Sequence, residues 1–495
     1  MKKPIIYQLL VRLFGNTNTQ NKLFGSIEEN GCGKFNHINN EVLIALKDFG
    51  ISHIWLTGIL EHATCTDYSQ FGIAPDKPET VKGKAGSPYA VKDYFDVDPD
   101  LAEDIPQRFM EFESLLKRIH DHGLSAIIDF IPNHVARQYF SDQKPPQTIN
   151  LGETDDKSIA FSPQNNFYYI PNQPLSLPDE IHKLPYSGFG HQTYEEFPAK
   201  ATGNDCFSAN PAFTDWYETI KLNYGIDYVN GGQSFFDPIP STWYRMEEIL
   251  LFWASKKVDG FRCDMAEMVP VDFWKWLIPR IKKQYPEIVF IAEIYNPSRY
   301  HEFIHIACFD FLYDKEGLYN VIRDVITSPR PSSAIPDIID QLYPYNKHLL
   351  RFIENHDEQR VASSFFASSP WAGFAASVIS ALAGNGPFMI YCGQETGEKA
   401  LGASGFSGDD GRTSIFDYCS IPQHVKWMNK LNFGTQELDQ DSNNLREQYK
   451  RLFYIVNNEP VFSIGQYYNL LWNNLPSNIF PSDKIFPFLR YSEKK

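Results

Sequence analysis

The chain has 495 residues, enough for one large catalytic domain with insertions or for two to three modest domains. Its formal net charge of -16 argues against nucleic acid or an anionic membrane surface as the main partner, because both require a basic face. No stretch approaches the roughly 20 apolar residues of a membrane-spanning helix. A globular protein with a neutral substrate fits these properties better.

Short apolar runs alternate with longer amphipathic stretches, a pattern typical of a parallel sheet covered by helices. Strands are predicted over residues 5–14, 52–56, 125–131, 260–263, 288–292, 308–312, 349–353 and 387–392. Helices are predicted between them over residues 105–122, 271–285 and 371–382. Eight alternating strands predict a (β/α)8 TIM barrel. A doubly wound open sheet also alternates, but it usually carries a Gly-rich phosphate loop after a strand, and none is present.

One interval breaks this rhythm, between the third strand and a helix that begins near Ser241. About a hundred residues rich in Asn, Pro, Tyr and Gly lie here, and a loop that long is normally functional or a small domain of its own. We therefore expect an inserted subdomain over residues 133–240 that forms one wall of the cleft. The barrel is then expected to occupy residues 1–132 and 241–460, and residues 461–495 to form a C-terminal extension or the start of a truncated β-domain.

The cysteines and the N-terminus bear on the compartment. Seven cysteines are scattered without a CxxC pair, at Cys32, Cys65, Cys206, Cys263, Cys308, Cys392 and Cys419. Such a set is typical of free thiols in a reducing compartment. The first apolar run is interrupted by Gln8 and Arg12, and no small-residue cleavage site follows, which indicates a strand rather than a signal peptide. The sequence predicts a cytoplasmic protein.

Polar residues fall at the carboxyl ends of four predicted strands. Taken singly, each has a simpler explanation as a helix cap, a structural histidine or an ion pair. Because these strand ends meet on one face of a barrel, together they predict an active site. In strand order they are Asp129, Asn133 and His134; Arg262 and Asp264; Glu293; and His356 and Asp357.

These segments resemble the ordered sequence regions of the α-amylase superfamily, glycoside hydrolase family 13. The resemblance runs from residues 7–8 (Tyr-Gln) to residues 393–395 (Gly-Gln-Glu), so it spans most of the chain. It implies that Asp264 is the nucleophile, Glu293 the general acid/base and Asp357 the stabiliser of the distorted sugar. It further implies that four residues surround the reacting glucosyl ring: Arg262, His134, His356 and the stacking tyrosine Tyr89.

The physical chemistry of these residues agrees with such roles. A retaining glycosidase needs two carboxylates about 5–5.5 Å apart, one ionised to attack and one protonated to donate. Arg262 lies two residues before Asp264 on one strand, so we expect its permanent charge to keep Asp264 ionised. We expect the charges of Asp264 and Asp357 to raise the pKa of Glu293.

The resemblance also implies a structural Ca²⁺ bound by Asn133 together with oxygen ligands from the inserted subdomain, because hard oxygen ligands suit this ion. A capping amide is the alternative for Asn133. Asn223 lies in what resembles a further family segment late in the same subdomain. No organic cofactor is expected.

The sequence departs from the family pattern at several positions. Glu267 and Met268 stand where many α-amylases carry a basic residue and a histidine, so the acceptor side is expected to be more acidic and apolar. Gly86 stands three residues before Tyr89, where exo-acting relatives often place an aspartate. Conversely, residues 410–413 (Asp-Gly-Arg-Thr) loosely resemble a segment with which exo-acting relatives grip a chain end.

The end of the chain also departs from the family, which generally finishes with an antiparallel β-domain. Only residues 479–491 look strand-like before the last residue. We therefore expect that domain to be absent or truncated. An apolar surface is then expected near Trp472, Phe480 and Phe486.

Together these features predict an α-amylase-like retaining α-glucoside hydrolase that acts on α-glucans or maltooligosaccharides through a covalent glycosyl-enzyme intermediate. A transglycosylase or sugar isomerase of the same superfamily is the alternative, because it shares the nucleophile and the acid. A non-catalytic carbohydrate-binding relative would be expected to lack at least one of the three acids, and all three are present.

Overall fold

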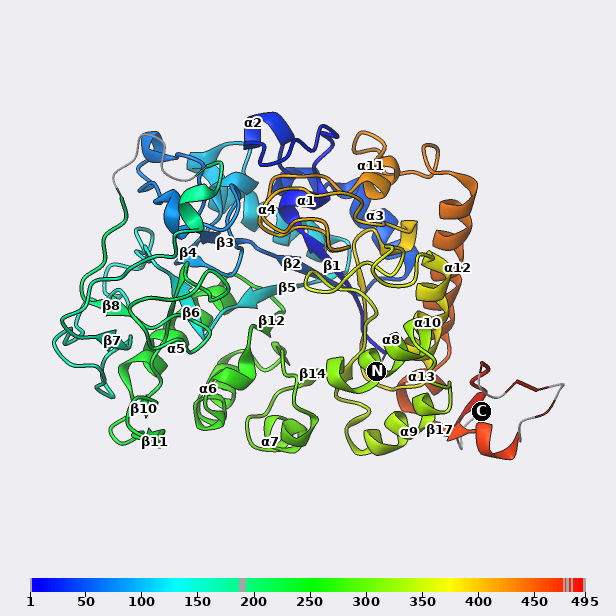
Figure 1. Ribbon diagram of the computed structural model, residues 1–495. Coiled ribbons are helices and arrows are strands. Elements are labelled where there is room, and N and C mark those ends of the chain that lie inside the picture. Colours follow the sequence, from blue (N-terminus) through cyan, green and yellow to red (C-terminus); the bar gives the residue numbers. More distant parts are fainter. Residues whose placement is uncertain (1, 187–192, 475–476, 478–479, 482–483, 493–495) are drawn as a thin grey trace.

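The computed structural model (Figure 1) describes residues 2–186, 193–474, 477, 480–481 and 484–492. Eight parallel strands at its centre pair in the order β15-β14-β13-β12-β5-β2-β1-β16. A parallel bridge between Arg351 and Phe388 joins the two outer strands, so the sheet closes on itself. The predicted (β/α)8 barrel is confirmed. Its strands are β1 (Ile5–Leu10), β2 (His53–Thr57), β5 (Ser125–Phe130), β12 (Gly260–Cys263), β13 (Val289–Ala292), β14 (Phe311–Tyr313), β15 (Leu349–Leu350) and β16 (Phe388–Tyr391).

Helices surround these strands (Figure 1). On α6 the buried residues Phe273, Trp274, Leu277, Ile278 and Ile281 follow the 3.6-residue period of a helix that packs one face against a core. No helix in the described ranges is both long and apolar enough to span a bilayer. The helices are α1 (Val11–Phe14), α2 (Ile27–Asn30), α3 (Asn40–Phe49), α4 (Arg108–Asp121), α5 (Ser241–Ser255), α6 (Val271–Gln284), α7 (Tyr300–His305), α8 (Asn320–Thr327), α9 (Ala334–Gln341), α10 (Pro370–Leu382), α11 (Pro422–Met428), α12 (Gln440–Asn458) and α13 (Val461–Ile464).

The first predicted strand is too long. β1 ends at Leu10, and residues 11–14 form the short helix α1. All ten residues from Ile5 to Phe14 are buried. A largely apolar run that is buried throughout fits a strand and a helix equally well, so its hydrophobic pattern could not mark the change.

Residues 133–240 contain short antiparallel strand pairs joined by long loops. They lie together beside the barrel, at the left of Figure 1, and α5 begins directly after them. The proposed limits of this subdomain and of the barrel segments remain predictions. The pairs are β6 (His134–Ala136) with β9 (Thr219–Lys221), β7 (Tyr169–Ile170) with β8 (Ala199–Lys200), and β10 (Ile226–Asp227) with β11 (Gln233–Ser234).

A further pair, β3 (Leu60–His62) with β4 (Val91–Val97), follows the second barrel strand. Near the end of the chain, β17 (Gln466–Asn469) pairs with β18 (Phe488–Tyr491). Of the predicted strand 479–491, only the last four residues form β18, and Ile479, Ser482 and Asp483 lie outside the described residues. Trp472 is 63% exposed, whereas Phe480 and Phe486 are half-buried. The apolar surface expected here is therefore only partly exposed.

Candidate active site

A cavity of about 370 Å³ brings predicted site residues together. Asp264 directly follows β12 and Glu293 directly follows β13, so both carboxylates stand at the same end of adjacent strands. His134, Tyr89 and Asp357 line the same cavity. Five of the seven residues predicted to act on the sugar therefore face one space, and the other two lie buried behind it.

Arg262 is the first of these buried residues, and its guanidinium forms hydrogen bonds or ion pairs with four side chains. Its Nη1 donates to Asp264 Oδ1 at 2.6 Å and to Asp129 Oδ1 at 3.4 Å. Its Nη2 forms an ion pair with Glu293 Oε1 at 2.7 Å, and its Nε donates to the Tyr313 hydroxyl at 3.2 Å. Because a guanidinium does not lose its proton in proteins, Asp264 and Glu293 share one permanent counter-charge. The sequence predicted the contact with Asp264 but not the one with Glu293.

Burial dominates the proton affinities of the three carboxyl groups. Arg262 lowers the pKa of Asp264 as expected, but burial outweighs it, and this pKa lies above its ordinary value. Burial raises the pKa of Glu293 too, and the charge of Asp264 adds to the rise while Arg262 opposes it. Burial, followed by the charge of Glu293, raises the pKa of Asp357 to about 8. The neighbouring charges on which the sequence argument relied are the smaller cause.

His356 is the second buried residue, and its hydrogen bonds define its tautomer. The Gln8 Nε2 lies 2.7 Å from His356 Nδ1. Because an amide NH₂ only donates, Nδ1 accepts and the ring proton is on Nε2. That nitrogen lies 3.1 Å from Asp357 Oδ2 and also contacts the Tyr89 hydroxyl. Burial, with the charge of Arg262 second, lowers the pKa of His356 well below its ordinary value. The neutral ring therefore positions Asp357 and Tyr89.

His134 also lines the cavity, at the start of β6. Burial lowers its pKa to about 4, so the ring is neutral near pH 7. A neutral imidazole can donate to a sugar hydroxyl without adding a full charge to the site. Its ring centroid lies 5.2 Å from that of Trp216. Trp216 belongs to the segment 133–240 and also lines the cavity.

Comparison with known proteins gives a family for this arrangement. The family model "Alpha amylase, catalytic domain" matches residues 8–306. The chain belongs to the alpha-amylase family. It is 23% identical over 385 residues to Alpha-amylase 3 of Dictyoglomus thermophilum, covering 74% of this chain and 66% of that protein. It is 37% identical over 227 residues to an alpha-1,4-glucan:maltose-1-phosphate maltosyltransferase of Cereibacter sphaeroides, covering 45% of this chain and 23% of that protein.

Among solved structures, the debranching enzyme of Nostoc punctiforme aligns with a TM-score of 0.63 at 18% sequence identity. The alignment covers 99% of this chain and 87% of that one, and at this identity it shows the fold alone. The two curated relatives are matched over just under two thirds and about a quarter of their own lengths. The matches therefore establish the alpha-amylase family and its barrel fold. The exact activity of this member depends on its own residues.

Asn133, the expected calcium ligand of this alpha-amylase family member, already has protein partners. Its Oδ1 accepts a hydrogen bond from Lys221 Nζ at 2.9 Å, and its Nδ2 donates to the Gly203 carbonyl oxygen at 2.8 Å. The Lys221 ammonium is buried and pairs with Asp205 at 2.5 Å. A calcium ion would have to displace this ammonium, because two cations repel at such a distance. The donors around Asn133 therefore do not fit Ca²⁺.

Asn223, which the sequence placed in a further family segment, is a structural residue. It is fully buried, and its Nδ2 donates to the carbonyl oxygens of Ser162 and Asn165 at 2.8 and 2.9 Å. Its Oδ1 accepts from the Gly225 backbone N–H at 2.8 Å. These hydrogen bonds pair both the donor and the acceptor of the Asn223 amide, and they connect the segments around residues 162–165 and 223–225.

Two departures from the family pattern have structural explanations. Gly86 has φ +77°, and a Cβ built there would stand 1.7 Å from the Ala63 carbonyl oxygen, so an aspartate cannot occupy this position without moving the backbone. Glu267 and Met268 do not contribute to the described cavity lining, whereas Met265 does. The carboxylate of Glu267 instead accepts from the Asn296 backbone N–H at 3.2 Å.

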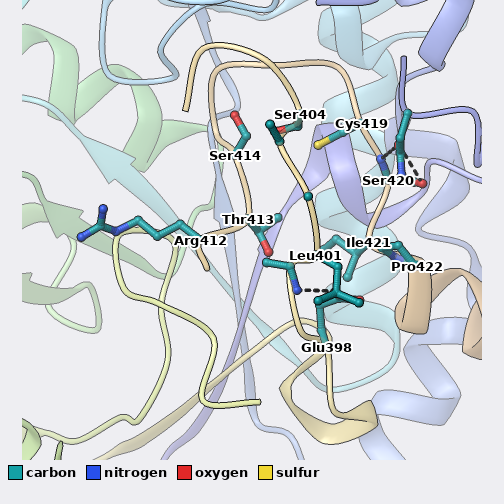
Figure 2. Close-up of a pocket in the computed structure, with 14 residues that line it drawn as sticks. Glu398, Leu401, Ser404, Arg412, Thr413, Ser414, Cys419, Ser420, Ile421 and Pro422 are labelled. Atoms are coloured by element: carbon teal, nitrogen blue, oxygen red, sulfur yellow. Dashed lines mark hydrogen bonds between the residues drawn. The ribbon is translucent and has the colours of Figure 1, made fainter. Parts of the chain in front are cut away.

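Arg412, within the predicted chain-end segment, lies beside the active site. Its Nε donates to the Asp357 carbonyl oxygen at 2.7 Å, and its Nη1 pairs with Asp410 at 2.7 Å. In Figure 2 its side chain points away from the other labelled residues around a second hollow. That hollow measures about 120 Å³, below the roughly 300–1,000 Å³ of ordinary ligand pockets. The larger cavity remains the candidate active site.

The structure adds residues that sequence reasoning missed. The Tyr295 hydroxyl donates to Glu293 Oε1 at 2.7 Å. Because residues two apart in an extended segment point to the same side, the position of Tyr295 two residues after Glu293 could have predicted this contact. Lys82 and Glu218 form an ion pair at 2.9 Å in the cavity wall. They come from loops more than a hundred residues apart, so no local pattern could have joined them.

Proposed function

We propose that this chain is a retaining glycoside hydrolase that cleaves α-glucosidic bonds in α-glucans or maltooligosaccharides. The observation that carries the proposal is the pairing of Asp264 and Glu293 with one guanidinium, at 2.6 and 2.7 Å. The two carboxyl groups also share a side-chain hydrogen bond. This closeness favours direct attack over the inverting mechanism, in which carboxyls about 6.5–9.5 Å apart leave room for a water.

In the first step the Asp264 carboxylate would attack the anomeric carbon while Glu293 gives its proton to the departing glycosidic oxygen. The carbon–oxygen bond to the leaving sugar breaks, and an ester between Asp264 and the glucosyl unit forms. The hydrogen bond between the two groups lowers the pKa of Asp264, which favours placing the proton on Glu293. Glu293 then takes a proton from water, and the hydroxide displaces Asp264.

The remaining residues would hold the sugar. The neutral His134 can donate to a hydroxyl, and the Tyr89 ring supplies an apolar face for the sugar's C–H groups. Asp357, whose Oδ2 is 3.1 Å from His356, would hydrogen-bond the distorted ring. None of these groups adds a positive charge that would compete with the charge developing on the anomeric carbon.

Transfer to a sugar acceptor is the second candidate. Trp216, Met265 and Phe416 line the cavity, and apolar side chains there would hold a sugar face while limiting water. The same nucleophile and acid serve both outcomes, so only the acceptor differs.

The test is to incubate the protein with maltoheptaose, pullulan, sucrose and trehalose and follow the products by proton NMR. We expect the α-anomer to appear first from maltoheptaose, and longer oligosaccharides to accumulate only if transfer competes. An initial β-anomer would overturn the retaining mechanism. Turnover of none of the four substrates would overturn the proposed activity.

A further inference from the structure

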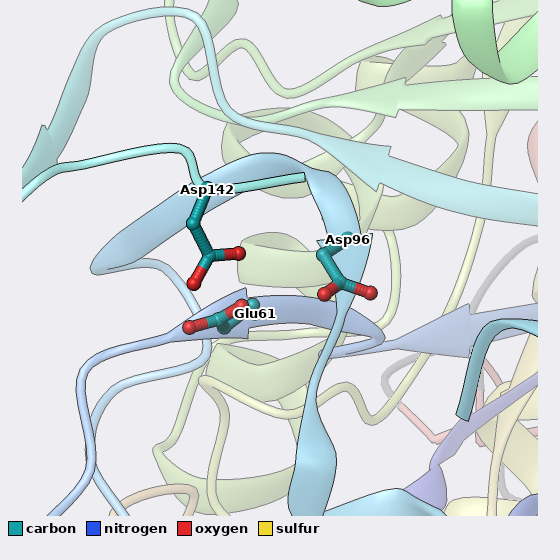
Figure 3. Close-up of side chains that lie close together, drawn as sticks. All are labelled: Glu61, Asp96 and Asp142. Atoms are coloured by element: carbon teal, nitrogen blue, oxygen red, sulfur yellow. The ribbon is translucent and has the colours of Figure 1, made fainter. Parts of the chain in front are cut away.

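Three carboxylates gather at a second place, away from the candidate active site. Glu61 lies on β3, Asp96 on β4 and Asp142 in a loop after β6, early in residues 133–240. One oxygen of each lies within 4.8 Å of an oxygen of the others. Figure 3 shows the three side chains pointing toward a common space. Three chain segments therefore place negative charge at one point.

The cations beside this cluster are already engaged. Lys92 Nζ lies 3.0 Å from Asp76 Oδ2 but 4.0 Å from Glu61 Oε1, so it belongs mainly to Asp76. Arg108 pairs with Asp96 through Oδ2. Glu61 and Asp142 thus have no close cation of their own among the described residues. The cluster has more negative than positive charge.

An independent observation points to a missing partner. Glu61 is 3% exposed, and its Oε2 is enclosed without a hydrogen-bond donor among the described residues. Leaving a buried carboxylate oxygen unpaired costs free energy, and buried charges in proteins are normally paired or bound to metal.

We propose that Glu61, Asp96 and Asp142 bind a hard divalent cation, Ca²⁺ in preference to Mg²⁺. All three donors are oxygen atoms, which suit hard cations. Ca²⁺ accepts irregular sets of six to eight oxygens, whereas Mg²⁺ requires near-ideal octahedral geometry that one exposed loop residue and two strand residues do not supply. Asp142 is exposed, so the ion can enter from solvent and complete its shell with water. The ion would fasten the start of residues 133–240 to the β3–β4 pair.

The test uses the whole chain, stripped of metal with EDTA and dialysed into metal-free buffer. CaCl₂ and, separately, MgCl₂ are titrated by calorimetry, and thermal unfolding is recorded with each. We expect one Ca²⁺ per chain, tighter binding than Mg²⁺, and a higher unfolding temperature with Ca²⁺. Absence of binding at millimolar concentrations of both ions would overturn the proposal.

Variants locate the site. Glu61→Gln keeps the size of the side chain, and we expect at least tenfold weaker Ca²⁺ binding. Asp142→Asn removes one charge from an exposed position, so it tests the site even if the buried substitution prevents folding. Asp179→Asn, at an exposed carboxylate outside the cluster, is the matched control and should bind as the native protein does. Native affinity in both cluster variants would place the ion elsewhere and refute the assignment.

Discussion

Two buried cations hold different parts of this chain. Arg262 stands at the floor of the candidate active site and contacts three carboxylates. Lys221 stands at the base of residues 133–240 and contacts the amide oxygen of Asn133 and the half-exposed Asp205. Burial lowers the pKa of Lys221, whereas the surrounding acids raise that of Arg262. A permanent charge thus lies beside the carboxyl groups that we propose to react, whereas an ammonium makes a contact that we interpret as structural.

The largest expected effect comes from removing the group that Arg262 serves. Asp264→Asn should reduce turnover of maltoheptaose by several orders of magnitude, because an amide cannot form the glycosyl ester. Far-ultraviolet circular dichroism and the unfolding temperature should stay close to native. Near-native turnover would contradict the assignment of Asp264 as nucleophile.

Replacing Arg262 itself tests whether its permanent charge stabilises the buried carboxyl groups. Arg262→Met should cost about 3–5 kcal/mol of unfolding free energy, because it leaves buried carboxylates without a counter-charge. The matched control is Arg280→Met, whose half-exposed guanidinium pairs with Glu247 at 2.6 Å. Urea unfolding should show a loss of at most about 1 kcal/mol in that control. Equal losses in the two variants would refute the central role of Arg262.

Lys221→Met tests the other cation and should cost less. We expect a loss of about 1–3 kcal/mol in unfolding free energy, since the buried Asn133 Oδ1 loses its donor. Asp205→Asn removes only the partly exposed ion-pair partner and should cost less than about 1 kcal/mol. Both values come from urea unfolding. If Lys221→Met were as stable as the native protein, the ammonium would not be holding Asn133.

The smallest expected effect concerns the proton of Glu293. The Tyr295 hydroxyl donates to Glu293 and so lowers its pKa. Tyr295→Phe should therefore raise that pKa. Because Glu293 must be protonated to act as the acid, kcat/KM falls as pH rises through its pKa, and the variant should keep activity to higher pH, by less than about one unit. A shift of the alkaline limb toward lower pH would contradict this reading.

The barrel and the residues around the cavity could be predicted from the sequence because both depend on local patterns of apolar and polar residues. Asp264 and Glu293 follow short apolar runs, and the carboxyl ends of such strands must meet. The contact between Arg262 and Glu293 depends on the register in which β12 pairs with β13, and the sequence alone does not give that register. Lys221 reaches Asn133 across 88 positions, so no local pattern in the sequence could show that an ammonium contacts this amide oxygen. The end of β1 was missed because α1 is as completely buried as β1, and a mostly apolar run continues from one into the other.

The closure of the barrel has a consequence for how the chain is made. β1 pairs with β16, and Ile5 lies opposite Phe388, some 380 residues later. At about 5–20 residues per second, a ribosome needs roughly 20–80 s between these two strands. During that time one edge of β1 has no partner, and an unpaired edge invites wrong pairing. The hydrogen bond that Tyr7 donates to the Glu395 carboxylate at 2.7 Å therefore cannot form until β16 has been synthesised.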